Sequence, residues 1–140
     1  MDENWSHELL EASRRRGEAE EQRFLALVDQ AFGQCTLEVA RVLMKTFSDA
    51  PDFGTQERVC GALASARPEV AVRAILEELP RLLVDAPQWA ESLIGEEVEH
   101  RPDLLKSVAA SMPGEARMAL RQLLSTKDFR DFYPSATSLL

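Results

Sequence analysis

The acidic side chains in the middle of this chain are its best candidates for chemistry, because several of them recur at helical spacing and could share a helical face. Glu96 and His100 are four residues apart, which would place a carboxylate and an imidazole on one helical face, as a metal site requires. No HExxH motif accompanies them, and the only other histidine is His7. A surface ion pair is the favoured interpretation, and no metal or other cofactor is predicted.

Paired carboxylates could also act as acid and base in catalysis. Glu77 with Glu78, and Glu96 with Glu97, are adjacent in the sequence, so on a helix the two side chains of each pair point about 100° apart and do not converge on one reacting atom. The chain has no GxSxG motif to present a nucleophile and no glycine-rich phosphate loop. We therefore predict that the protein is not an enzyme.

Negative charge is concentrated in one part of the chain. Between Glu69 and Asp103, nine acidic residues against three basic residues contribute −6 of the net charge of −8. Such a surface repels nucleic acid and anionic membranes and attracts a basic protein. The alternative interpretation is a solvated face that keeps the protein soluble.

The elements that must position these acids are predicted by an internal repeat. Residues 49–53 (DAPDF) return as 85–89 (DAPQW), and residues 67–69 (RPE) return as 101–103 (RPD). A period in the mid-thirties with two helical patterns per copy is typical of stacked helical hairpins. The sequence therefore predicts an all-α fold, a short HEAT-like stack of antiparallel helical hairpins with about seven helices.

We expect one all-helical domain over residues 1–140. It would comprise a weakly amphipathic N-terminal segment (1–19), helical hairpins (20–126) and an irregular aromatic tail (127–140) that either caps the stack or contacts a partner. Thr55 is a plausible helix cap, and Asp85 with Gln88 fits a capping box. Pro80 should kink or break its helix. Trp89 and Phe53 occupy matching repeat positions and are expected in the core rather than exposed.

The cysteines and the absence of long apolar runs in the sequence indicate the compartment of the protein. Cys35 and Cys60 are too few for a disulfide scaffold, and they read as small apolar residues. No apolar run is long enough to span a membrane, and the first residues lack the features of a signal peptide. A cytoplasmic protein is expected.

Three segments carry a resemblance to a known family: residues 49–57 (DAPDFGTQE), 75–80 (ILEELP) and 86–93 (APQWAESL). Together they resemble small HEAT-like immunity proteins of bacterial polymorphic toxin systems, such as contact-dependent growth inhibition, and particularly the immunity protein 30 group. The resemblance covers residues 24 to 125. It implies a protein that binds one cognate toxin domain, often a nuclease, and neutralises it. We expect a monomeric free protein and a 1:1 complex.

The charge pattern and the resemblance together give a hypothesis for the binding site. A nuclease active site is generally basic, so an acidic patch can compete for it. The expected contact residues are Glu77, Glu78, Asp85, Glu96, Glu97 and Glu99. Reversal of Glu96 and Glu97 to Lys should weaken the complex, and its affinity should fall with salt. The alternative function is a helical-repeat adaptor or regulatory subunit with a basic protein partner.

Overall fold

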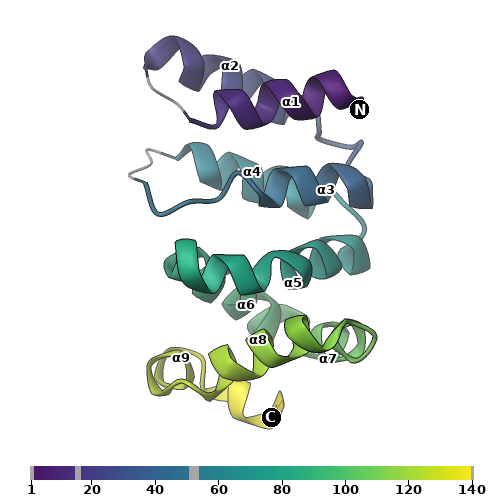
Figure 1. Ribbon diagram of the computed structural model, residues 1–140. Coiled ribbons are helices and arrows are strands. Elements are labelled where there is room, and N and C mark those ends of the chain that lie inside the picture. Colours follow the sequence, from purple (N-terminus) through teal and green to yellow (C-terminus); the bar gives the residue numbers. More distant parts are fainter. Residues whose placement is uncertain (1, 15–16, 51–53, 140) are drawn as a thin grey trace. The chain divides into compact units, whose positions relative to one another are not determined.

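The computed structural model describes residues 2–14, 17–50 and 54–139 of the chain (Figure 1). The protein is all-helical, with 79% helix and no strand among the described residues, which confirms the predicted all-α class. The helices are α1 (Glu3–Ala12), α2 (Glu18–Asp29), α3 (Leu37–Met44), α4 (Thr55–Ala64), α5 (Pro68–Asp85), α6 (Pro87–His100), α7 (Pro102–Ala110), α8 (Gly114–Ser125), α9 (Lys127–Phe132) and the 3-10 helix η1 (Pro134–Leu139).

The helices in this part of the chain outnumber the seven or so that the sequence predicts. Of these, α1 lies in the N-terminal segment, whose weak amphipathic pattern allows a short helix, whereas α9 and η1 lie where the sequence predicts an irregular tail. Residues 127–132 and 134–139 are thus helical. Short helices depend on tertiary burial more than on a long periodic pattern: Trp5 is buried in α1 and donates from its indole nitrogen to the Leu27 carbonyl at 2.9 Å, and Phe129 is buried in α9.

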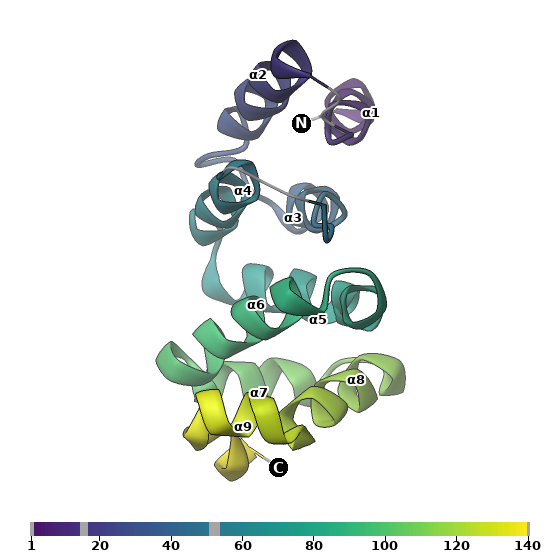
Figure 2. The same ribbon diagram turned by 90° about the vertical axis from the view of Figure 1, so that its left-hand side faces the viewer.

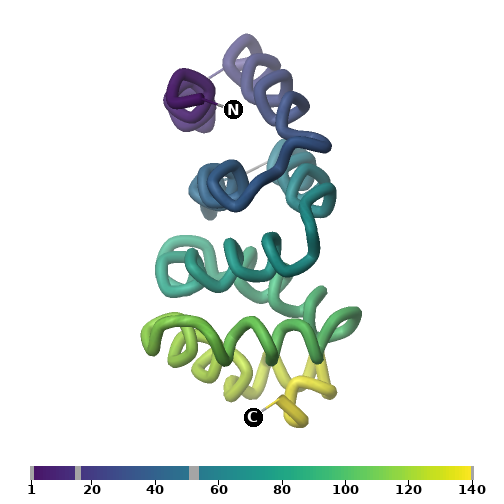
Figure 3. Tube along the Cα trace, turned by 90° about the vertical axis from the view of Figure 1, so that its right-hand side faces the viewer, coloured from purple at the N-terminus to yellow at the C-terminus, as the bar shows by residue number. Residues whose placement is uncertain are grey.

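The chain separates into two compact units, Met1–Ala71 and Val72–Leu140, with the boundary inside α5. In the first unit, α2 packs against α1 and α4, and α3 packs against α1 and α4 (Figures 2 and 3). The core of the first unit is apolar and includes Leu9, Phe24, Val28, Leu43, Met44, Phe47 and Val59. The expectation of one domain for residues 1–140 stays a prediction.

In the second unit, consecutive helices pack against one another and against η1. α6 contacts α7 and η1, α7 contacts α8, and α8 contacts both α9 and η1. Its core includes Leu76, Leu79, Leu82, Ile94, Val98, Leu105, Leu124 and Phe129. The contacts of η1 with α6 and α8 bring the end of the chain against two earlier helices, and this arrangement positions the candidate site.

Two local predictions are wrong, and the break considered at Pro80 does not occur. The cap of α4 is Gly54, at φ 98°, a left-handed backbone that glycine adopts without strain, and Thr55 is the first helical residue. Asp85 is the last residue of α5 rather than a cap for α6. The helix also does not break at Pro80, because Leu79 and Leu82 around it are fully buried and hold the helix in place. Phe53, the expected counterpart of Trp89, lies outside the described residues, and Trp89 is half-buried.

Candidate interaction surface

The candidate site is built on α6, whose limits follow from its sequence. Pro87 occupies the first turn, where its missing N–H costs nothing, and Pro102 opens the next helix two residues after His100. One face of α6 is buried through Leu93, Ile94 and Val98. The other face carries exposed acids, namely Glu91, Glu96 and Glu99.

Gly95 lies on α6 directly beneath the ring of Tyr133. A Cβ atom at Gly95 would stand 2.1 Å from Cζ of Tyr133 and 2.5 Å from its hydroxyl oxygen, so only glycine allows this contact. Tyr133 follows α9 and stacks at a tilt on Phe129 and Phe132, with ring centroids 4.9 and 5.0 Å away. Phe129 is buried, whereas Phe132 is 76% exposed. The tyrosine ring, which lies on α6, therefore contacts both a core ring, Phe129, and an exposed ring, Phe132.

The phenol of Tyr133 sits in a negative electrostatic field. Burial raises the pKa of Tyr133 above the ordinary value of 10.0, and the charges of Glu99, Glu96 and Glu91 raise that pKa further. Glu91 and Glu99 are one helical turn before and after Gly95, so they flank the ring on the same face of α6. We call Glu91, Glu96, Glu99 and Tyr133 the α6 acidic face.

Glu97 has a different role from its neighbours on α6. It is 5% exposed and accepts two hydrogen bonds from Arg101, at 2.9 Å from Nε and 2.5 Å from a terminal nitrogen. This bidentate pair neutralises a buried carboxylate and so belongs to the framework of the helix. Lysine at position 97 would disrupt that framework, so the reversal of Glu96 and Glu97 together cannot report on binding.

Glu96 and His100 form the ion pair expected from their spacing. The oxygen and the imidazole nitrogen are 3.4 Å apart, and the pair is charged on both sides only when His100 is protonated. Glu96 is 71% exposed, so its carboxylate also faces solvent. Among the described residues, no group of three His, Cys, Asp or Glu side chains could hold a metal ion.

The three predicted contact residues on α5 are each paired with an arginine of the same helix. Glu77 accepts a hydrogen bond from Arg73 at 3.3 Å, Glu78 accepts one from Arg81 at 2.5 Å, and Asp85 lies 3.6 Å from Arg81. Arginine remains charged at all physiological pH values, so much of the negative charge of α5 is locally compensated.

Of the six predicted contact residues, Glu96 and Glu99 thus belong to the α6 acidic face. Sequence reasoning missed Glu91 and Tyr133 as members. The signal for Glu91 was its distance of four residues from Gly95, matched by Glu99 on the other side. No local signal exists for Tyr133, because it lies 38 residues beyond Gly95 and reaches it only through packing.

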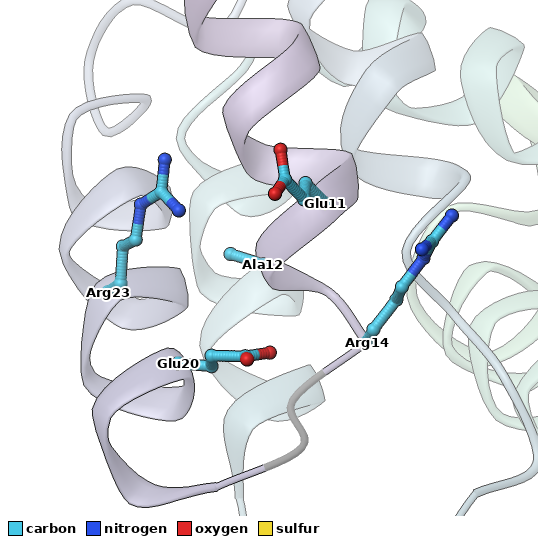
Figure 4. Close-up of a pocket in the computed structure, with 5 residues that line it drawn as sticks. All are labelled: Glu11, Ala12, Arg14, Glu20 and Arg23. Carbon is cyan, nitrogen blue, oxygen red and sulfur yellow. The ribbon is translucent and has the colours of Figure 1, made fainter.

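The first unit has a hollow of its own, lined by Glu11, Ala12, Arg14, Glu20 and Arg23 at the α1–α2 connection (Figure 4). Acidic and basic side chains alternate around it, so it offers no field of a single sign. Among the described helices, none combines the length and the apolar character needed to cross a membrane.

No protein-family model, curated protein or solved structure matches the chain. The class of the protein is therefore given by its own features: an all-helical chain with an acidic, tyrosine-centred face on α6.

Proposed function

We propose that the protein binds a basic protein partner through the α6 acidic face. The observation that carries this proposal is the position of Tyr133. Its phenol lies in the field of three exposed carboxylates, and its ring packs on Gly95, where a side chain would clash with it. A carboxylate cluster around an aromatic ring combines attraction for cationic side chains with an apolar surface for their aliphatic stems. Lysine and arginine side chains are the complementary chemistry.

The charge balance of α6 supports a binding role over simple solubility. Glu91 and Glu99 have no basic group within ion-pair distance in the part of the chain that the structure describes. Arg101, which directly follows α6, is engaged by the buried Glu97. Uncompensated exposed charge speeds encounter with an opposite charge and fixes its orientation. Phe132, beside Tyr133, adds an exposed aromatic side chain of the kind enriched at interfaces.

The biological form of this function is neutralisation of a toxin domain. The resemblance of three segments to polymorphic-toxin immunity proteins implies a cognate toxin, often a nuclease, and a nuclease needs a basic surface for its phosphate substrate. The proposal places the complex in the cytoplasm with one copy of each protein. It also includes the finer fold prediction, in which the successive helices form HEAT-like hairpins.

Binding is tested with the toxin domain encoded beside the gene, purified and titrated calorimetrically. The double variant Glu91→Lys/Glu99→Lys should lose at least about 10-fold in affinity, because each reversal replaces an attraction by a repulsion. The control variant Glu38→Lys/Glu57→Lys changes the net charge equally at exposed positions of the first unit and should lose no more than about 3-fold. Equal losses from the two variants would reject the α6 acidic face as the binding site.

Neutralisation is tested by growth. Cells that produce the toxin should survive only with the protein present, and the lysine double variant should protect them less well. An adaptor would instead give a phenotype on deletion in cells that lack the toxin. Such a phenotype, together with no protection, would contradict the immunity function while leaving the binding result to be judged separately.

A further inference from the structure

A second charged surface lies on α8 and has the opposite sign. Arg117 and Arg121 are four residues apart and both are exposed, so they share one face of the helix. Neither has a carboxylate within ion-pair distance among the described residues, in contrast to Arg58, Arg73, Arg81 and Arg101. Two like charges at this spacing destabilise a helix slightly, so the pair gives no structural benefit of its own.

The two arginines line two hollows in the surface of the second unit. One hollow is lined by both arginines together with Gly114 and Met118. The other is lined by the same arginines and by apolar side chains of α7, α8 and η1, including Ala109, Leu124 and Leu139. Met118 is 74% exposed. Cationic groups therefore border an apolar surface on both sides.

We propose that this α8 arginine face, made of Arg117, Met118 and Arg121, binds an acidic protein segment that carries an apolar side chain between its carboxylates. Each guanidinium can hold one carboxylate through two hydrogen bonds, and two carboxylates one helical turn apart match the spacing of the arginines. The apolar side chain fills the hollow beside Leu124 and Leu139. Arginine and methionine are both enriched in the buried centres of protein interfaces.

The observations favour this occupant over others. A small inorganic anion gains nothing from an apolar wall or from an exposed methionine. Anionic membranes, nucleic acids and a second copy of the chain all meet the long-range repulsion of a protein with net charge −8. A short acidic segment is affected less, because it carries few charges and because screening weakens the repulsion from acids that lie farther away than about 8 Å at physiological salt. From Leu104 onward, five basic residues against three acidic residues make the local balance positive.

The experiment uses the full chain, labelled with ¹⁵N and with ¹³C-methyl methionine, and a synthetic peptide as the probe. The peptide is helical and about 15 residues long, with two glutamates four residues apart and a leucine between them. We expect it to shift the Nε–H resonances of Arg117 and Arg121 and the methyl resonance of Met118. Matched peptides carry glutamine in place of both glutamates, or serine in place of the leucine, and each should bind at least about 10-fold more weakly.

Protein variants then locate the site. Arg117→Glu and Arg121→Glu should each weaken binding of the glutamate–leucine peptide at least about 10-fold, whereas Arg130→Glu, the same change at another exposed arginine of the unit, should change it less than about 3-fold. Arg117→Glu places an acid one turn before Arg121, a stabilising arrangement, so a raised Tm would accompany the loss of binding. Loss of binding with a lowered Tm would instead indicate damage to the fold, and Arg121→Gln would then have to reproduce the loss at unchanged Tm.

Three results would overturn the proposal. The peptide could shift resonances away from α8, or inorganic phosphate could displace it and shift the same arginine signals, which would make the face a simple anion site. Sedimentation could also show that the chain associates with itself through α8. None of these results bears on the α6 acidic face, which is tested with its own variants and its own partner.

Discussion

Each compact unit places an aromatic ring against a helical glycine, and the two contacts differ in what surrounds them. In the first unit the ring of Phe32 lies 3.1 Å from where a Cβ of Gly61 would stand, and in the second the ring of Tyr133 lies 2.1 Å from the corresponding position at Gly95. The residues one turn either side of Gly61 are Glu57 and Ser65, whereas both such neighbours of Gly95 are glutamates.

Residues next to Gly61 form hydrogen bonds with other parts of the first unit. The backbone N–H of Gly33 donates to the Ser65 hydroxyl at 3.2 Å, and Arg58 of α4 donates to Asp29 of α2 at 2.7 Å. On α6, by contrast, Glu91 and Glu99 face solvent. The same packing device thus serves the structure of one unit and, in the other, presents an acidic surface. The two contacts therefore differ in the residues beside the ring, which are two exposed glutamates on α6 and one glutamate with a hydrogen-bonded serine at Gly61.

The largest effect is expected from removing the arginine that neutralises the buried part of α6. Arg101→Met leaves the Glu97 carboxylate buried without its partner, and it should lower the free energy of unfolding by about 2–3 kcal/mol. The matched change in the first unit, Arg58→Met, removes an exposed pair and should cost no more than about 1 kcal/mol. Urea unfolding followed by far-UV circular dichroism measures both. Similar losses would mean that Glu97 is not held as a buried charge.

The two glycines allow the comparison to be tested directly. Gly95→Ala forces the Tyr133 ring off the helix, and a net destabilisation of about 1–2 kcal/mol should remain after the gain in helix propensity. Gly61→Ala needs only a small shift of the partly exposed Phe32 ring, so it should be neutral within about 0.5 kcal/mol or stabilising. The double variant Gly95→Ala/Tyr133→Ala should not show the clash. If alanine is tolerated equally at both glycines, the Tyr133 ring is not held rigidly over Gly95.

A smaller effect of opposite sign is expected on α8. Arg117→Glu replaces a repulsion with Arg121 by an attraction, and it places an acid in the first turn of α8, where the helix dipole favours negative charge. It should therefore raise the free energy of unfolding by about 0.5 kcal/mol. Salt at about 1 M should reduce this gain, because the pair is exposed. Thermal unfolding at low and high salt provides the measurement, and a stability loss at low salt would contradict the assignment of these arginines as an unrelieved pair.

The smallest effect at neutral pH concerns Tyr133, the only tyrosine of the chain. Because its folded-state pKa is raised, the tyrosine contributes stability that is present below about pH 10 and is lost as the pH rises through the folded-state pKa. Glu99→Gln should lower that pKa toward its ordinary value, as seen by tyrosinate absorbance, and should narrow the pH range over which stability is lost. Glu57→Gln in the first unit is the control and should leave the titration unchanged.

Much of the helical structure could be predicted from the sequence, because burial in a helix follows the helical period. The stripe of Val39, Leu43 and Met44 is buried as the spacing predicts, and Thr36 caps that helix by accepting from the Val39 N–H at 3.3 Å. Phe32 is eight residues after Phe24, a spacing that predicts the same buried helical face, but it is 41% exposed. The chain has already left α2 at Asp29, so the helical period no longer governs the direction of its side chain.

The acidity of the middle of the chain and the pairing of Glu96 with His100 were determined by the sequence alone, because both depend on composition or on spacing within one helix. Only the tertiary structure decided that Glu97 is buried beside Arg101, and that Tyr133 rests on Gly95 between Glu91 and Glu99. The pattern of one helix states which residues share a face. It does not state which distant residue will cover that face, because this depends on how α6 and η1 pack together.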